Sequence, residues 1–263
     1  MGISKQEFEK QKRERLGKEN YNTFGTLMKI IEYNAYKDIW VEFQDEYKAK
    51  IHTEYQNFLR GNCKNPYDKT VCNIGYIGDG KYKSKINKKD TEPYKMWHHM
   101  IRRCYDTCQL NRRPTYTNCY VCKEWLNFQN FAKWYEENYY ECNGEEMHLD
   151  KDILIKDNNV YSPSTCIIVP KRINCLFIKR QNDRGKYPIG VCYHNRDNVL
   201  EVWCCNKECK QQYLGRFNNE KDAFNCYKQF KEGVIKQVAD EYKDLIPKEL
   251  YEALYKYEVE IND

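Results

Sequence analysis

The sequence predicts a multi-domain α+β protein. Short runs with the apolar content or alternation of strands occur in three separate regions, and segments with apolar residues at helical spacing lie between and after them. The chain has 263 residues, more than one typical domain. We therefore expect, in order, a small β-rich module, a strand–strand–helix centre, a three-stranded sheet with a helix, and a C-terminal helix.

The first twenty residues predict a charged helical arm. Ser4 and Glu7 have the spacing of a capping box, which marks the start of a helix. Few apolar residues follow before Leu16, so we expect residues 1–20 to have little surface to pack.

A small β-rich module is expected over residues 21–80. Its strand-like runs are 28–33, 39–43 and 71–77. In the second run Ile39, Val41 and Phe43 alternate with Trp40 and Glu42, as in a half-buried strand. Trp40 and Tyr33 could form an exposed stacking surface, although packing in the core is the interpretation that we favour.

Two basic runs separate the expected modules. Residues 81–92 contain five lysines and are expected to be a linker, and a second run lies between Lys171 and Lys186. Two explanations fit this charge equally well: the runs are connectors that contact DNA phosphates, or they are ordinary solvated linkers. The net charge is only +5, so the placement of the basic residues matters more than their total.

Two amphipathic helices are expected after the first basic run. One begins near Pro93, which suits the first turn of a helix. The second covers about 123–137. Their apolar residues recur at helical spacing and are expected in the core: Trp97, Met100, Ile101, Cys104, Trp125, Phe128, Phe131, Ala132 and Tyr135.

The segment that follows carries side chains suited to a divalent metal ion. Successive side chains of a strand point to opposite faces, so we expect His148, Asp150 and Asp152 on one face. A second, apolar strand at 166–169 leads into a short helix that places Asn174 within reach of the first strand. An Asp and an Asn could then share one ion. The alternative is a solvated strand edge.

This arrangement resembles the HNH, or ββα-metal, nucleases, and more closely the HNH-like, homing-endonuclease-type proteins of bacteriophages. The motifs that carry the resemblance are Trp97-x-x-Met100-x-x-Arg103-Cys104-Tyr105, Val121-x-x-x-Trp125-x-x-Phe128-x-x-Phe131, the acidic strand and Tyr161-Ser162-Pro163. The resemblance implies an HNH-like domain over residues 93–180 that binds Mg²⁺ or Mn²⁺ through Asp150, Asp152 and Asn174. It also implies a DNA endonuclease or nickase that hydrolyses phosphodiesters with help from the metal.

One position departs from the family. In HNH nucleases a His that acts as general base follows the metal-binding Asp, but here that position is Lys151. A Lys with its ordinary pKa of about 10 is a poor base at neutral pH unless burial or a neighbouring cation lowers the pKa. The base would be His148, Lys151 or a water-linked group. Lys151 favours an alternative function, a catalytically inactive DNA-binding regulator or phage anti-defence protein that retains the HNH fold.

Four thiols within 19 residues could hold a structural zinc ion: Cys104, Cys108, Cys119 and Cys122. A Cys-x2-Cys pair suits zinc, but a Cys-x3-Cys pair inside a helix would need an unwound end. Free cysteines, buried or half-buried, are the interpretation that we favour.

Residues 188–232 predict three short strands and a helix, at 191–193, 200–205, 212–217 and 220–232. The segment resembles the Apetala-type (ethylene-response-factor) DNA-binding domain through Gly190-Val191, Trp203, Tyr213-Leu214-Gly215-Arg216-Phe217, Ala223 and Tyr227. The resemblance implies that the sheet lies in the major groove of double-stranded DNA and reads bases.

Two residues are carried over as DNA-binding candidates, Trp203 and Arg216. Strand alternation places Trp203 outward with Glu201, and packing on the helix is the alternative. Weaker candidates for phosphate contacts are Arg196, Lys207 and Lys210.

The tail, residues 233–263, has helical spacing that is interrupted at Ile246-Pro247, and it could dock on the last domain or pair two subunits in a homodimer. The sequence has no apolar run of 18 residues and no export signal, so we expect neither a membrane span nor secretion. We expect a cytoplasmic protein, in a bacterial host cell if the resemblance holds. Double-stranded DNA is the expected partner, and a host or phage protein is a further one.

Overall fold

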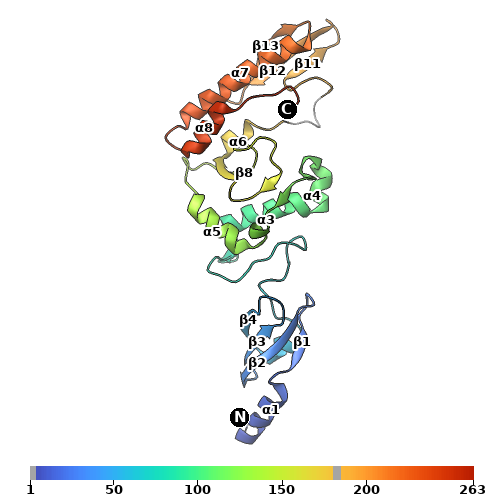
Figure 1. Cartoon of the computed structure of the whole chain (residues 1–263), viewed down its shortest axis with the longest axis vertical. Coiled ribbons are helices and arrows are strands. Elements are labelled where there is room, and N and C mark those ends of the chain that lie inside the picture. Colours follow the sequence, from blue (N-terminus) through green and yellow to red (C-terminus); the bar gives the residue numbers. More distant parts are fainter. Residues whose placement is uncertain (1–3, 180–184) are drawn as a thin grey trace. The chain divides into compact units, whose positions relative to one another are not determined.

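The computed structural model describes residues 4–179 and 185–263. The chain divides into two compact units, Met1–Glu136 and Glu137–Asp263 (Figure 1). Both units combine helices with small antiparallel sheets, which agrees with the expected α+β class. Within the described ranges, no helix is both long enough and apolar enough to cross a membrane.

A four-stranded antiparallel sheet forms the first part of unit 1. Its strands pair in chain order: β1 (Glu19–Tyr21), β2 (Leu27–Ala35), β3 (Asp38–Phe43) and β4 (Lys50–Thr53). The alternation predicted for β3 is confirmed, because Ile39, Val41 and Phe43 are fully buried whereas Trp40 is 38% exposed. Tyr33 lies in the core. Trp40 is therefore exposed, and Tyr33 is not.

The predicted third strand, 71–77, is wrong. Val71 and Gly75 form an isolated bridge that closes a turn. Cys72 and Asn73 inside this turn have φ values of 51° and 57°, a left-handed conformation that a strand does not contain. The apolar run is thus a turn, and the short helix α2 (Tyr55–Leu59) packs beside the sheet instead.

The charged arm forms helix α1 (Lys5–Arg15), capped by the Ser4 side chain, which accepts a hydrogen bond from the Glu7 N–H. It has more packing surface than its sequence predicts. Phe8 contacts the core of the sheet. The Arg15 guanidinium lies over three aromatic rings, those of Tyr33, Tyr36 and Tyr55. The arm is therefore part of the β-rich module.

The second part of unit 1 is mainly helical. Its elements are the hairpin β5 (Lys85–Ile86) and β6 (Lys89–Asp90), α3 (Glu92–Tyr105), α4 (Thr107–Arg112), η1 (Pro114–Tyr116), β7 (Tyr120–Val121), η2 (Lys123–Leu126) and α5 (Phe128–Asn138). The first predicted helix is confirmed, with Pro93 in the first turn. The second begins as the 3₁₀ turn η2, and Trp134 rather than Tyr135 is buried in α5.

Unit 2 begins with the expected strand–strand–helix unit. Strand β8 (Met147–Asp150) pairs with β10 (Ile167–Pro170), with β9 (Val160–Tyr161) in the connection, and α6 (Lys171–Cys175) follows directly. The three-stranded antiparallel sheet comprises β11 (Val191–His194), β12 (Val199–Cys205) and β13 (Gln211–Phe217). Helices α7 (Glu220–Glu241) and α8 (Lys248–Lys256) complete the unit. Helix α7 continues nine residues beyond its predicted end at Glu232.

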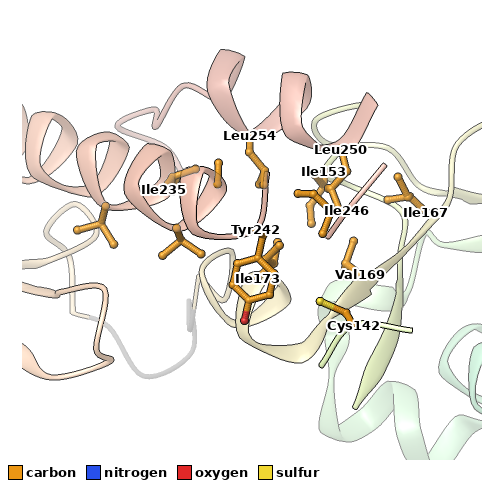
Figure 2. Close-up of a cluster of buried hydrophobic side chains, with 13 residues drawn as sticks. Cys142, Ile153, Ile167, Val169, Ile173, Ile235, Tyr242, Ile246, Leu250 and Leu254 are labelled. Atoms are coloured by element: carbon orange, nitrogen blue, oxygen red, sulfur yellow. The ribbon is translucent and has the colours of Figure 1, made fainter. Parts of the chain in front are cut away.

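Helix α7 contributes to two hydrophobic cores. Its first half packs on the three-stranded sheet through Ala223, Phe224 and Tyr227. Its second half packs with α8 on the strand–strand–helix unit, in a cluster that Figure 2 shows. That cluster includes Ile153, Ile167, Val169, Ile173, Val238, Ala239, Leu250 and Leu254. The predicted tail therefore docks within its own unit, against the strands that carry the candidate site.

Several residues of the second basic run form ion pairs in unit 2. Lys171 pairs with Glu146, Arg172 with Glu241, and Lys179 with Asp263. Arg180 and Arg184 of the same run lie outside the described residues.

Candidate metal centre and nucleic-acid interface

The strand–strand–helix unit brings His148 and Asn174 into contact. His148 lies opposite Val169 in the β8–β10 pair, and the chain passes from β10 straight into α6. This short path places the Asn174 Nδ2 atom 3.0 Å from His148 Nδ1. The expected approach of Asn174 to the first strand is thus confirmed.

Glu146 orients the His148 ring from the other side. The His148 Nε2 atom lies 3.3 Å from a Glu146 carboxylate oxygen, and the Lys171 ammonium donates to the other oxygen at 2.6 Å. A carboxylate only accepts hydrogen bonds, so Nε2 carries the proton and Nδ1 of the neutral ring accepts from the Asn174 amide. Lys171, and then His148, hold the pKa of Glu146 below its ordinary value. Sequence reasoning missed Glu146, although it lies only two residues before His148, next to the start of β8.

Asp150 ends β8 and turns the chain. One of its carboxylate oxygens accepts hydrogen bonds from the backbone N–H groups of Asp152 at 2.7 Å and Ile153 at 2.8 Å. Burial raises the pKa of Asp150, and these two backbone donors oppose the shift. A nearby cation would favour the charged carboxylate, which is the condition a metal ligand requires.

Lys151 is 7% exposed and closes the loop after β8. Its ammonium donates to the Asp152 carboxylate at 2.5 Å and to the Asn158 carbonyl at 2.6 Å. The Asn158 amide in turn donates to the Lys151 carbonyl at 2.8 Å. These contacts give Lys151 a structural role and place a positive charge beside Asp152, so Asp150 is the better metal ligand of the two carboxylates.

The donor atoms suit a hard divalent ion that keeps much of its water. No group of three or more His, Cys, Asp or Glu side chains is arranged to hold a metal ion in the part of the chain that the structure describes. Asp150 and Asn174 nevertheless supply a carboxylate and an amide, and Mg²⁺ is usually bound through one or two carboxylates plus several waters. The two residues are therefore of the kind that such an ion accepts as ligands.

The four cysteines considered for zinc differ in environment. Cys104 and Cys119 are buried, Cys122 is half-buried and Cys108 is exposed, and none is in a disulfide. Burial raises the pKa of Cys122, which opposes the thiolate form that binds zinc.

The outer face of the three-stranded sheet carries Trp203 and Arg216. Val202 and Cys204 are buried against α7, so Trp203 points to the opposite face, as the alternation predicts. Its ring lies 5.0 Å from that of Tyr213 on the neighbouring strand. Trp203 thus packs on another aromatic of the sheet face rather than on the helix.

Two acidic residues hold the Arg216 guanidinium. Its Nε and one Nη lie 3.1 and 3.0 Å from a Glu201 carboxylate oxygen, and the other Nη lies 3.0 Å from Asp197. The hydrogen bond to Glu201 raises the pKa of Arg216. A guanidinium has five N–H donors; the contacts with Glu201 and Asp197 occupy three of them, and the Tyr213 side chain also interacts with this guanidinium. Sequence reasoning did not identify the role of Asp197.

The weaker phosphate candidates have different surroundings. Arg196 and Lys210 are exposed near the two turns of the sheet. Lys207 instead donates to Glu241 at the end of α7 at 3.0 Å, and its carbonyl accepts from Arg172 of α6 at 3.0 Å. Lys207 therefore links the sheet to α7 and to the strand–strand–helix unit.

Comparisons with known proteins assign no family to the chain, because no family model, curated protein or solved structure gives a significant match.

Proposed function

We propose that the chain is a DNA-binding protein of the bacteriophage HNH-like type, an endonuclease or nickase, whose strand–strand–helix unit hydrolyses phosphodiesters with a divalent metal ion. The observation that carries the proposal is the contact between His148 and Asn174 on the β8–β10–α6 frame that also carries Asp150. Carboxylate and amide stand on this frame where the resemblance expects them, whereas the imidazole comes from His148 and not from the position after Asp150, which is Lys151.

Each residue has a role in this proposal. Asp150 and Asn174 would hold Mg²⁺ or Mn²⁺, whose charge would neutralise the leaving oxyanion. His148 is assigned as the general base, because its side chain is 27% exposed; its Nδ1 atom would take the proton once the hydrogen bond from the Asn174 amide opens. Glu146 would stabilise the resulting imidazolium.

The sheet of unit 2 is proposed as a surface that reads double-stranded DNA. Trp203 and Tyr213 would supply aromatic contact area, and the exposed Arg216 guanidinium would contact a base edge or a phosphate. The carboxylates of Glu201 and Asp197 fix the direction of the guanidinium, which reduces the entropy lost on binding.

A second candidate is a DNA-binding regulator or anti-defence protein without catalytic activity. The observation that favours it is Lys151, which occupies the position of the family's catalytic His and is bound to Asp152 and Asn158.

A plasmid-nicking assay separates the two candidates. Nicking of supercoiled plasmid is measured in Mg²⁺ or Mn²⁺, and binding of DNA by the protein is measured on the same samples. The comparison uses wild type, Asp150→Asn, His148→Ala and the matched control Asp157→Asn, an exposed acid of the same connection. The nuclease proposal predicts nicking that is lost in the first two variants and kept in the control. If every protein binds DNA and none nicks it, the catalytically inactive regulator is supported. If the proteins neither bind nor nick DNA, both candidates are excluded.

A further inference from the structure

The stretch expected to be a basic linker is folded as a β-hairpin. Lys85 pairs with Asp90 and Ile86 with Lys89, and the two turn residues, Asn87 and Lys88, have φ values of 49° and 65°. Two left-handed residues in a two-residue loop are the favoured connection of a hairpin. Residues 81–90 contain five lysines and one aspartate, a net charge of +4.

The base of this hairpin is tied to the helices of unit 1. The Gln129 side chain on α5 accepts from the Tyr82 N–H at 3.0 Å and donates to the Tyr82 carbonyl at 2.9 Å. Thr91, at the start of α3, donates from its backbone N–H to the Ser84 carbonyl at 3.0 Å. The hairpin is thus already ordered before any ligand binds, so binding costs it little conformational entropy.

Its tip combines positive charge with an exposed apolar side chain. Ile86 is 58% exposed, although isoleucine is among the residues most often buried. Lys88 and Lys89 at the tip are also exposed, as is Lys83 at the base, while Lys85 is paired with Asp90 at 3.4 Å. Neither the charge nor Ile86 contributes to the core of unit 1, so the tip has the composition of a contact surface.

We propose that hairpin 81–90 is a second DNA contact, in which Lys83, Lys88 and Lys89 bind phosphates and Ile86 packs against base edges in the minor groove. The inference rests on the proposed DNA binding but concerns a site separate from the three-stranded sheet. Double-stranded DNA is the occupant because a dense anion matches the lysines and because apolar side chains flanked by basic ones are used as wedges in the minor groove. A single isoleucine offers little apolar area for a lipid surface.

The salt dependence of DNA affinity tests the lysines. Each phosphate contact contributes a slope of about 0.9 in log affinity against log salt, so the triple variant Lys83→Gln, Lys88→Gln and Lys89→Gln should lower the slope by about 2.7. The matched control replaces three exposed lysines of α7 and α8 by Gln, Lys236, Lys248 and Lys256, and should leave the slope unchanged. Ile86→Ser should weaken binding up to about tenfold with the slope unchanged.

The outcomes separate this inference from the proposed function. If the wild-type protein fails to retain duplex DNA at low salt, both fail. If it binds DNA and the hairpin triple variant behaves like the control, the hairpin inference alone is overturned. The same proteins are tested on phosphatidylserine vesicles. If the triple variant loses vesicle binding but binds DNA as the wild type does, the hairpin inference is overturned in favour of a membrane contact. Far-UV circular dichroism verifies that each variant is folded.

Discussion

Replacement of Leu254 by Ala tests whether the two cores of unit 2 unfold together. Leu254 on α8 is fully buried in the cluster that supports the strand–strand–helix unit. The change removes three carbon atoms from a packed site and should lower the free energy of unfolding by about 3 kcal/mol, within the range of about 2.7–5 kcal/mol for such substitutions. With a urea dependence of about 2 kcal/mol per M, the unfolding midpoint should fall by about 1.5 M.

Trp203 fluorescence provides the assay. Trp203 is the one tryptophan of unit 2, because the other four tryptophans of the sequence precede residue 137. Its fluorescence is obtained as the difference between each protein and its Trp203→Phe counterpart. Trp203 belongs to the sheet that packs on the first half of α7, whereas Leu254 contacts the core at the second half. If the continuous helix α7 couples the two cores, the urea midpoint reported by Trp203 fluorescence falls by the same amount, about 1.5 M.

A surface substitution serves as the control. Leu245→Ala removes the same atoms from a side chain that is 37% exposed and should change stability by less than about 0.5 kcal/mol. An unchanged Trp203 midpoint in Leu254→Ala, with a shifted transition in far-UV circular dichroism, would show that the cores unfold independently and would refute the reasoning.

Four further substitutions have defined outcomes. Burial raises the pKa of Asp150 in the folded state, so its contribution to stability is present below its unfolded pKa of about 4 and is lost as the pH rises through the folded pKa. Asp150→Asn should therefore be more stable than wild type in urea at pH 7, with the difference gone below about pH 4; a less stable variant at pH 7 would contradict this. Gly190→Ala places a Cβ 2.0 Å from the Tyr227 ring at a φ of +78° and should lose about 2 kcal/mol or more, whereas Gly233→Ala, in open space within α7, should gain about 0.5–1 kcal/mol; equal thermal midpoints would argue against the described packing. Lys151→Met leaves Asp152 and the Asn158 carbonyl without their donor and should cost about 1–3 kcal/mol in thermal unfolding, yet keep nicking per folded molecule, and loss of nicking would make Lys151 catalytic.

Strand alternation accounts for the parts of the fold that sequence predicted well. Buried Ile39, Val41 and Phe43 and outward Trp203 follow from the period of two, which every strand with one buried face must obey. Asn174 was predicted near the first strand because only a short path separates β10 from α6.

Interactions between distant segments could not be predicted in the same way. Lys151 bonds to Asn158 across an irregular loop that has no periodicity to read. The hairpin at 85–90 has strands of two residues, too short for alternation, and its lysines look like those of a linker. Helix α7 has an ordinary amphipathic pattern, which does not reveal that its two halves pack on different partners.

Binding of Mn²⁺ measured by electron paramagnetic resonance tests the proposed metal centre most directly, since it needs neither DNA nor turnover. The proposal predicts one site per chain in the wild type that is lost in Asp150→Asn and kept in the control Asp157→Asn. An absence of bound Mn²⁺, or binding that Asp150→Asn leaves unchanged, would contradict a metal centre at β8 and α6.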